Sequence, residues 1–93
     1  MLIGICELFI YLPDCQSLKD KRSIIKSMKF HLRKKFNISI SEIGQKNIWK
    51  KSTIGICCIA DNRQIIDKII DSVIKDIDSH SKIELVNFQT SIG

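Results

Sequence analysis

The sequence predicts an α+β domain of the ferredoxin-like class, with the element order β-α-β-β-α-β. Three observations predict it. Four segments have the apolar patterning of strands, and two segments between them repeat apolar residues at helical spacing. The span between the second and third strands is too short for a crossover, so these strands form an antiparallel hairpin. We therefore expect a single domain over residues 1–93, a four-stranded antiparallel sheet with two helices on one face.

The first strand and helix are predicted from local signals. Residues 2–11, LIGICELFIY, form a strand that ends before Pro13, because proline cannot donate to a ladder. Ser17 followed three residues later by Asp20 resembles a capping box and predicts a helix that continues to about Phe36. The apolar residues of this helix define the face expected in the core: Leu18, Ile24, Ile25, Met28, Leu32 and Phe36.

The rest of the chain contains the hairpin, the second helix and the last strand. Residues 37–43 alternate Ile with polar residues, and residues 51–60 form a nearly continuous apolar strand. Asp61 or Asn62 caps a helix whose Ile and Val residues recur at helical spacing. The last strand is predicted over residues 82–92. Simple alternation places Val86, Phe88 and Ile92 on one of its faces, with Ile83 and Leu85 on the other.

Composition and motifs indicate a cytoplasmic protein and give no sign of an enzyme. No apolar run approaches the roughly 20 residues that span a bilayer, and residues 1–12 lack a signal peptide's basic start, so we expect no membrane partner. The four cysteines, none in a C-x-x-C spacing, are expected as buried reduced thiols, with Cys57 and Cys58 facing opposite ways. No catalytic residue, metal site, cofactor or small-molecule ligand is predicted.

Positive charge is concentrated on the first helix. The chain has a net charge of +5, and residues 17–37 hold eight Lys and Arg residues against the single acid Asp20. Five of these cations step by three or four residues and form a stripe beside the apolar face, with an aromatic residue at its outer edge. Such a stripe suits RNA phosphates and a stacked base, although a solvated lysine-rich helix face stays an open alternative. The stripe consists of Lys19, Arg22, Lys26, Lys29 and Arg33, edged by Phe30.

The predicted hairpin loop carries more basic residues around the single tryptophan. Lys46 and Lys50 extend the candidate nucleic-acid surface if the loop lies beside the first helix. Trp49 has two interpretations, a surface contact or a core anchor that closes the end of the sheet. We favour the core anchor, because a large aromatic side chain is more often buried.

The first strand is apolar on both sides, although helices cover only one face of such a sheet. Cys6, Leu8 and Ile10 alternate with a second apolar set, which consists of Ile3, Ile5, Phe9 and Tyr11. One interpretation is that this second set forms a homodimer interface on the open face of the sheet. The alternative is that the two sides of a central strand are simply buried unequally, and both interpretations stay open.

Three stretches of this sequence resemble the YlxP-like family of small bacterial proteins, a domain of unknown function. They are Ser17–Arg22, with the pattern S-L-K-x-K-R, then Phe36–Gly44, with the pattern F-N-x-S-x-x-E-x-G, and Ile48-Trp49. The resemblance implies a ferredoxin-like fold, bacterial origin and a gene neighbourhood of translation-initiation and ribosome-maturation factors. It implies no catalytic residues. Loop residues 45–47 lack the acid that the family pattern suggests. The resemblance makes ribosomal RNA or a ribosomal particle the preferred partner.

Overall fold

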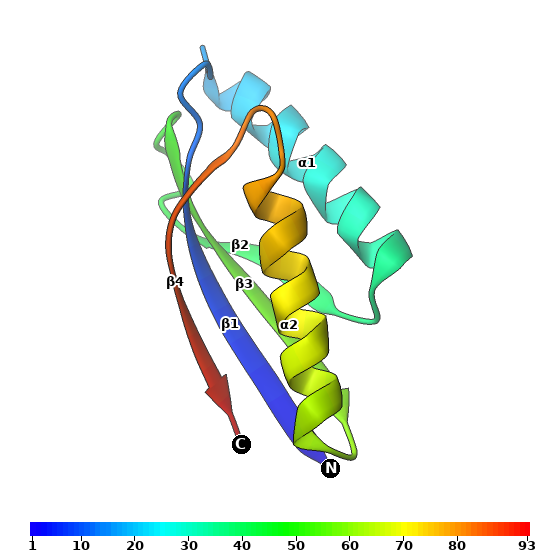
Figure 1. The fold of residues 1–93 in the computed structure, drawn as a ribbon. Helices are drawn as coiled ribbons and strands as arrows, with labels where there is room; N and C mark the ends of the chain where they lie inside the picture. Colours follow the sequence, from blue (N-terminus) through cyan, green and yellow to red (C-terminus); the bar gives the residue numbers. More distant parts are fainter.

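The structure, a computed structural model, describes residues 1–93 and confirms the predicted element order. Its four strands form one antiparallel sheet in the order β2-β3-β1-β4, and both helices lie on the same side of it (Figure 1). Neither helix combines the length and apolar composition needed to cross a membrane. The elements are β1 (Leu2–Tyr11), α1 (Leu18–Lys35), β2 (Ser39–Gly44), β3 (Lys51–Ala60), α2 (Arg63–Asp78) and β4 (Glu84–Ile92).

Side-chain caps begin both helices. The Ser17 hydroxyl accepts a hydrogen bond from the backbone N–H of Asp20 at 3.0 Å, as predicted, while the Asp20 carboxylate accepts from the N–H of Gln16 at 3.1 Å. At the second helix the structure selects Asn62, rather than Asp61, as the cap, and its side-chain oxygen accepts from a backbone N–H at 3.0 Å. Each cap satisfies an N–H group that has no partner inside the helix, and so fixes where the helix begins.

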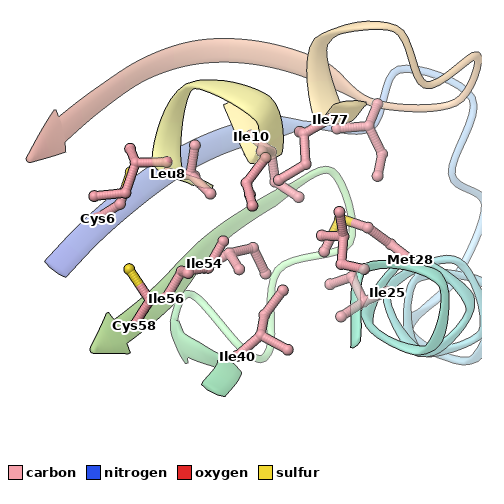
Figure 2. Close-up of a cluster of buried hydrophobic side chains, with 14 of the residues drawn as sticks. Cys6, Leu8, Ile10, Ile25, Met28, Ile40, Ile54, Ile56, Cys58 and Ile77 are labelled. Atoms are coloured by element: carbon pink, nitrogen blue, oxygen red, sulfur yellow. The ribbon is translucent and has the colours of Figure 1, made fainter. Parts of the chain in front are cut away.

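The hydrophobic core fills the space between the helices and one face of the sheet (Figure 2). The helix α2 packs across β1, β3 and β4, while α1 lies against β2 at one edge of the sheet. Of the predicted core face of α1, Ile25, Met28 and Leu32 are buried, and Ile24 and Phe36 pack against the core half-buried. The prediction is wrong for Leu18, which lies outside the core cluster. The buried side chains that the sheet supplies from β1, β2 and β3 are Cys6, Leu8, Ile10, Ile40, Ile54, Ile56 and Cys58.

Both edge strands contain a bulge, which the sequence analysis did not predict. In β4 the pairing with β1 shifts at Val86, so that Leu85 and Phe88 lie on the helix side of the sheet while Val86 lies on the open side, beside Phe9. The predicted grouping of Val86 with Phe88 is therefore wrong, because the extra residue breaks the alternation. In β2 the pairing with β3 shifts in the same way at Ile43.

Three of the four cysteines are buried, and all four are free thiols. Cys57 and Cys58 face opposite sides of β3, as predicted, but Cys57 is exposed on the open face, so its predicted burial is wrong. Burial raises the pKa of the Cys6 thiol to about 11, with smaller contributions from Cys58 and Glu7. Cys57 is thus the accessible thiol of the protein.

The close approach of α2 to β1 depends on the absence of a side chain at Gly4. A Cβ atom there would overlap Cγ2 of Ile66 and lie 3.1 Å from Sγ of Cys58. We expect Gly4→Ala to lower the free energy of unfolding in urea by about 1–3 kcal/mol, since overpacking shifts the helix from the sheet. Gly55→Ala is the matched control, because its Cβ would meet only the exposed side chain of Ile43, with Cδ1 and Cγ2 at 3.1 Å. Equal decreases of the free energy of unfolding in the two variants would contradict the close packing of α2 on Gly4.

Candidate nucleic-acid interface

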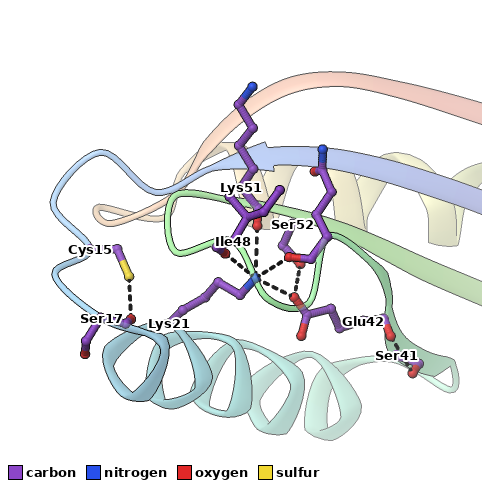
Figure 3. Close-up of polar contacts among 9 residues, drawn as sticks. Cys15, Ser17, Lys21, Ser41, Glu42, Ile48, Lys51 and Ser52 are labelled. Carbon is purple, nitrogen blue, oxygen red and sulfur yellow. Dashed lines mark hydrogen bonds and ion pairs between the residues drawn. The ribbon is translucent and has the colours of Figure 1, made fainter.

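A fully buried lysine joins the first turn of α1 to the hairpin loop between β2 and β3. The Lys21 ammonium donates to the backbone carbonyls of Gln45 at 2.7 Å, Ile48 at 2.6 Å and Lys51 at 3.0 Å (Figure 3). It also forms an ion pair with Oε2 of Glu42 at 3.0 Å. A buried ammonium is costly unless its protons are bonded and its charge is paired, and both conditions are met here.

The carboxylate partner of this lysine is itself fixed. Glu42 accepts a hydrogen bond from the buried hydroxyl of Ser52 at 2.5 Å, so its charge is compensated from two directions. The sequence analysis counted Lys21 among the surface cations and missed this role. A signal was present, because Lys21 precedes Ile25 and Met28 by four and seven residues and so shares their buried face.

Beside this network, α1 and β2 enclose an open groove with a volume of about 740 Å³. Side chains of the predicted stripe line it from the helix side, and Glu42 lines it from β2. The Arg33 guanidinium donates to the backbone carbonyl of Ile40 at 3.1 Å, which anchors this cation against the outer edge of β2. The structure thus brings together Arg22, Lys26, Lys29, Phe30 and Arg33.

Phe30 is exposed over 56% of its surface, as its predicted position at the edge of the stripe requires. The Lys34 ammonium lies 4.6 Å from the centre of its ring, within the range of a cation–π contact. The ring of His31 meets it edge to face, with the centroids 5.9 Å apart. The ring therefore lies in a cationic surrounding while keeping surface available for stacking.

The remaining predicted contacts lie outside this groove. Lys19 is exposed near the start of α1, and Lys46 is exposed in the hairpin loop. The ammonium of Lys50 donates to the backbone carbonyl of Pro13 at 2.6 Å and thereby ties the loop to the segment after β1. The cations of the groove and the cations of the hairpin loop therefore form two separate groups.

The favoured core position for Trp49 is wrong, because half of its surface is exposed. The loop carbonyls converge on Lys21, whose buried stem occupies this end of the core. The loop backbone, rather than the indole ring, therefore faces inward. Ile48 beside it is similarly exposed.

The side of the sheet away from the helices is apolar mainly along its two central strands. The registers place Ser39 and Ser41 of β2, and Asn87, Gln89 and Ser91 of β4, on this same side. On β1, the predicted set divides into the exposed Ile3 and Ile5 and the half-buried Phe9 and Tyr11. The opposite side of β1 is buried in the core, so the two sides are assigned as predicted. Further apolar side chains are exposed on this open face from the other strands, namely Ile43, Ile59 and Val86.

The fold and the site together define a small ferredoxin-like α+β protein with a basic groove between its first helix and a sheet edge. The chain belongs to the family described as "Protein of unknown function (DUF503)", whose model matches residues 3–90. It is 39% identical over 79 residues to "Uncharacterized protein YlxP" of Bacillus subtilis (strain 168), covering 85% of this chain and 84% of that protein. The resemblance drawn from the sequence motifs is thereby confirmed.

Among solved structures, the chain is similar to "De novo designed protein Foldit4". The TM-score is 0.52 and the sequence identity is 12%, with 100% of this chain and 94% of that chain covered. At this level of identity the similarity concerns the arrangement of strands and helices alone.

The buried ion pair provides a test of how α1 is held to the hairpin. We expect Lys21→Met to lower the free energy of unfolding by about 3–5 kcal/mol, because it leaves a carboxylate and three carbonyls without their shared donor. Adding Glu42→Leu should restore part of that loss, since the uncompensated charge is then removed. A double-mutant cycle in urea measures both effects. Purely additive losses would show that the two side chains are not coupled.

Proposed function

We propose that the protein binds the phosphate backbone of RNA through the groove between α1 and β2, without catalysing a reaction. The observation that supports this most directly is the convergence of Arg22, Lys26, Lys29 and Arg33 on one groove with the exposed ring of Phe30. Cations neutralise phosphates and release their counterions, while an exposed ring stacks on a base of any identity.

The spacing of the groove cations suits a polyanion that lies along the helix. Lys26, Lys29 and Arg33 step by three and four residues, which corresponds to about 4.5–6 Å along the helix axis. Successive phosphates of one strand are separated by similar distances, so one strand can contact several cations at once. Single-stranded RNA is favoured over a duplex, because stacking on Phe30 requires an unpaired base.

The single acid of the groove does not cancel this attraction. The carboxylate of Glu42 is paired with Lys21 and accepts from Ser52, so its charge is already compensated inside the protein. The acidic side chains of α2, by contrast, lie outside the groove. The resemblance to the YlxP-like family, with its implied neighbourhood of ribosome-maturation genes, makes ribosomal RNA the RNA we propose first.

Charge reversal in the groove tests this proposal. We expect the double variant Lys26→Glu/Lys29→Glu to abolish binding to a fluorescent single-stranded RNA while leaving the thermal midpoint nearly unchanged, because neither residue lies in the core. Lys68→Glu/Lys75→Glu on α2 is the matched control, since it changes the net charge equally on exposed positions outside the groove. It should bind nearly as well as the wild type.

The salt dependence gives a second measure of the same contact. If about four phosphates are engaged, log affinity should fall against log salt concentration with a slope of about −3. Binding that survives the groove reversal, or that the α2 control weakens equally, would show that net charge rather than the groove attracts the RNA. Fluorescence anisotropy over a series of salt concentrations measures both quantities.

A second candidate function is that of an interaction protein acting through its open sheet face. The exposed apolar side chains on that face favour it, since a contiguous apolar patch of this kind is typical of a protein contact. This candidate does not compete with the first, because the groove and the open face are different surfaces.

A further inference from the structure

We propose that a second copy of this chain covers the open face of the sheet, and that Glu7 keeps the resulting dimer weak and reversible. The proposal rests on the second candidate function and is independent of RNA binding. A second copy of the chain is the partner of the face, and Glu7, the charged side chain near the centre of the face, limits the affinity.

The extra residues of the two bulges add apolar side chains to the open face. Ile43 is the extra residue of β2, and its side chain lies over Gly55 with Cδ1 3.1 Å from the position of a Cβ there. Val86 is the extra residue of β4 and is 67% exposed. With Ile5 at 48% and Ile59 at 55% exposure, apolar side chains project from all four strands. Bulges commonly re-aim a side chain, and the bulge in β4 places Val86 on the uncovered side, whereas Ile43 lies there by simple alternation from Ile40.

The dimensions of this face suit a second copy. Three strands of nine or ten residues and the six-residue β2 form the face. With strands about 4.8 Å apart and about 3.3 Å per residue, they present roughly 500–600 Å² before side-chain relief is counted. Stable interfaces bury about 800 Å² per partner and weak, transient ones less than about 600 Å², so the area of this face suits a weak dimer. Two such sheets stack face to face at about 10 Å, and a two-fold axis makes one patch complementary to itself.

The charges of the open face do not attract RNA, which is the partner proposed for the groove. Lys51 and Glu84 both pair with Tyr11 at one end of the sheet, and Glu7 is the remaining charged residue. One cation against two acids offers no attraction to nucleic acid. A second copy brings the same kind of face, with an apolar centre, uncharged polar residues on its edge strands and few charges, and such a face can pack against itself.

Glu7 limits the affinity of this contact. Its carboxylate lies between Gly55 and Gln89 in the register of the sheet and lines a depression of about 370 Å³ with Ile5 and Cys57. It forms no hydrogen bond or ion pair with the rest of the chain. A second sheet would remove water from it without supplying a cation, since the partner face presents its own Glu7 near the centre.

Sedimentation of the full chain up to about 200 μM tests both parts of the proposal. We expect a concentration-dependent monomer–dimer equilibrium for the wild type and a dimer dissociation constant lowered by about tenfold or more in Glu7→Gln. Ile5→Glu and Val86→Glu should be monomeric, and the second variant serves if the first fails to fold. Ile65→Glu, an exposed isoleucine of α2 outside the face, should dimerise as the wild type does.

Three outcomes would overturn the proposal, two of them for the dimer and one for the role of Glu7. Monomeric wild-type and Glu7→Gln chains at the highest concentration would exclude the dimer, and a dimer that persists in Val86→Glu would place the interface elsewhere. A Glu7→Gln dimer no tighter than the wild type would remove the role of Glu7. RNA binding by the monomeric Val86→Glu variant, measured separately, distinguishes failure of the dimer from failure of the groove.

Discussion

The position of α1 depends on one buried ammonium group. Three loop carbonyls and the Glu42 carboxylate converge on Lys21, so the first turn of the helix and the β2–β3 hairpin are fixed to one point. Because these partners lie 21 to 30 residues further along the chain, the network closes only when α1 packs against the β2–β3 hairpin. It also fixes the side of β2 on which the helix lies, and thereby forms the groove. The exposed position of Trp49 follows from the same convergence.

The same network explains how α1 can bear many cations without losing its place in the fold. One lysine of the helix faces the core and is neutralised by Glu42, while the groove cations remain directed to solvent. The acid nearest the groove is thus compensated by a buried lysine rather than by the exposed stripe. The groove stays positive beside the Glu42 carboxylate because Lys21, on the buried face of α1, compensates that charge. The groove cations lie on the exposed face of the same helix and are left unpaired with Glu42.

The elements could be predicted from the sequence because each depends on local periodicity and local caps. Ser17 and Asn62 lie within three residues of the N–H groups that they cap, so their signals are visible without a fold. The bulges at Ile43 and Val86 depend instead on pairing between strands, and alternation within one strand cannot reveal them. Lys21 was missed for a different reason, since lysine was assigned to the surface by residue type although its spacing matched the core. The groove was predicted in part, as a stripe of cations whose wall on β2 only the structure supplies.

The residues that carry the family resemblance are mainly those that build the fold. Within S-L-K-x-K-R, Ser17 caps α1 and Lys21 holds the hairpin, and the glutamate of the second motif is Glu42. By contrast, Lys26, Lys29 and Arg33 of the groove lie outside these motifs, as do Glu7 and Val86 of the open face. The motifs therefore carry mainly the architecture, while three of the four groove cations lie outside them and only Arg22 belongs to one. The ion pair that holds α1 to the hairpin therefore joins two motif positions, Lys21 and Glu42, and so links the first motif to the second in space.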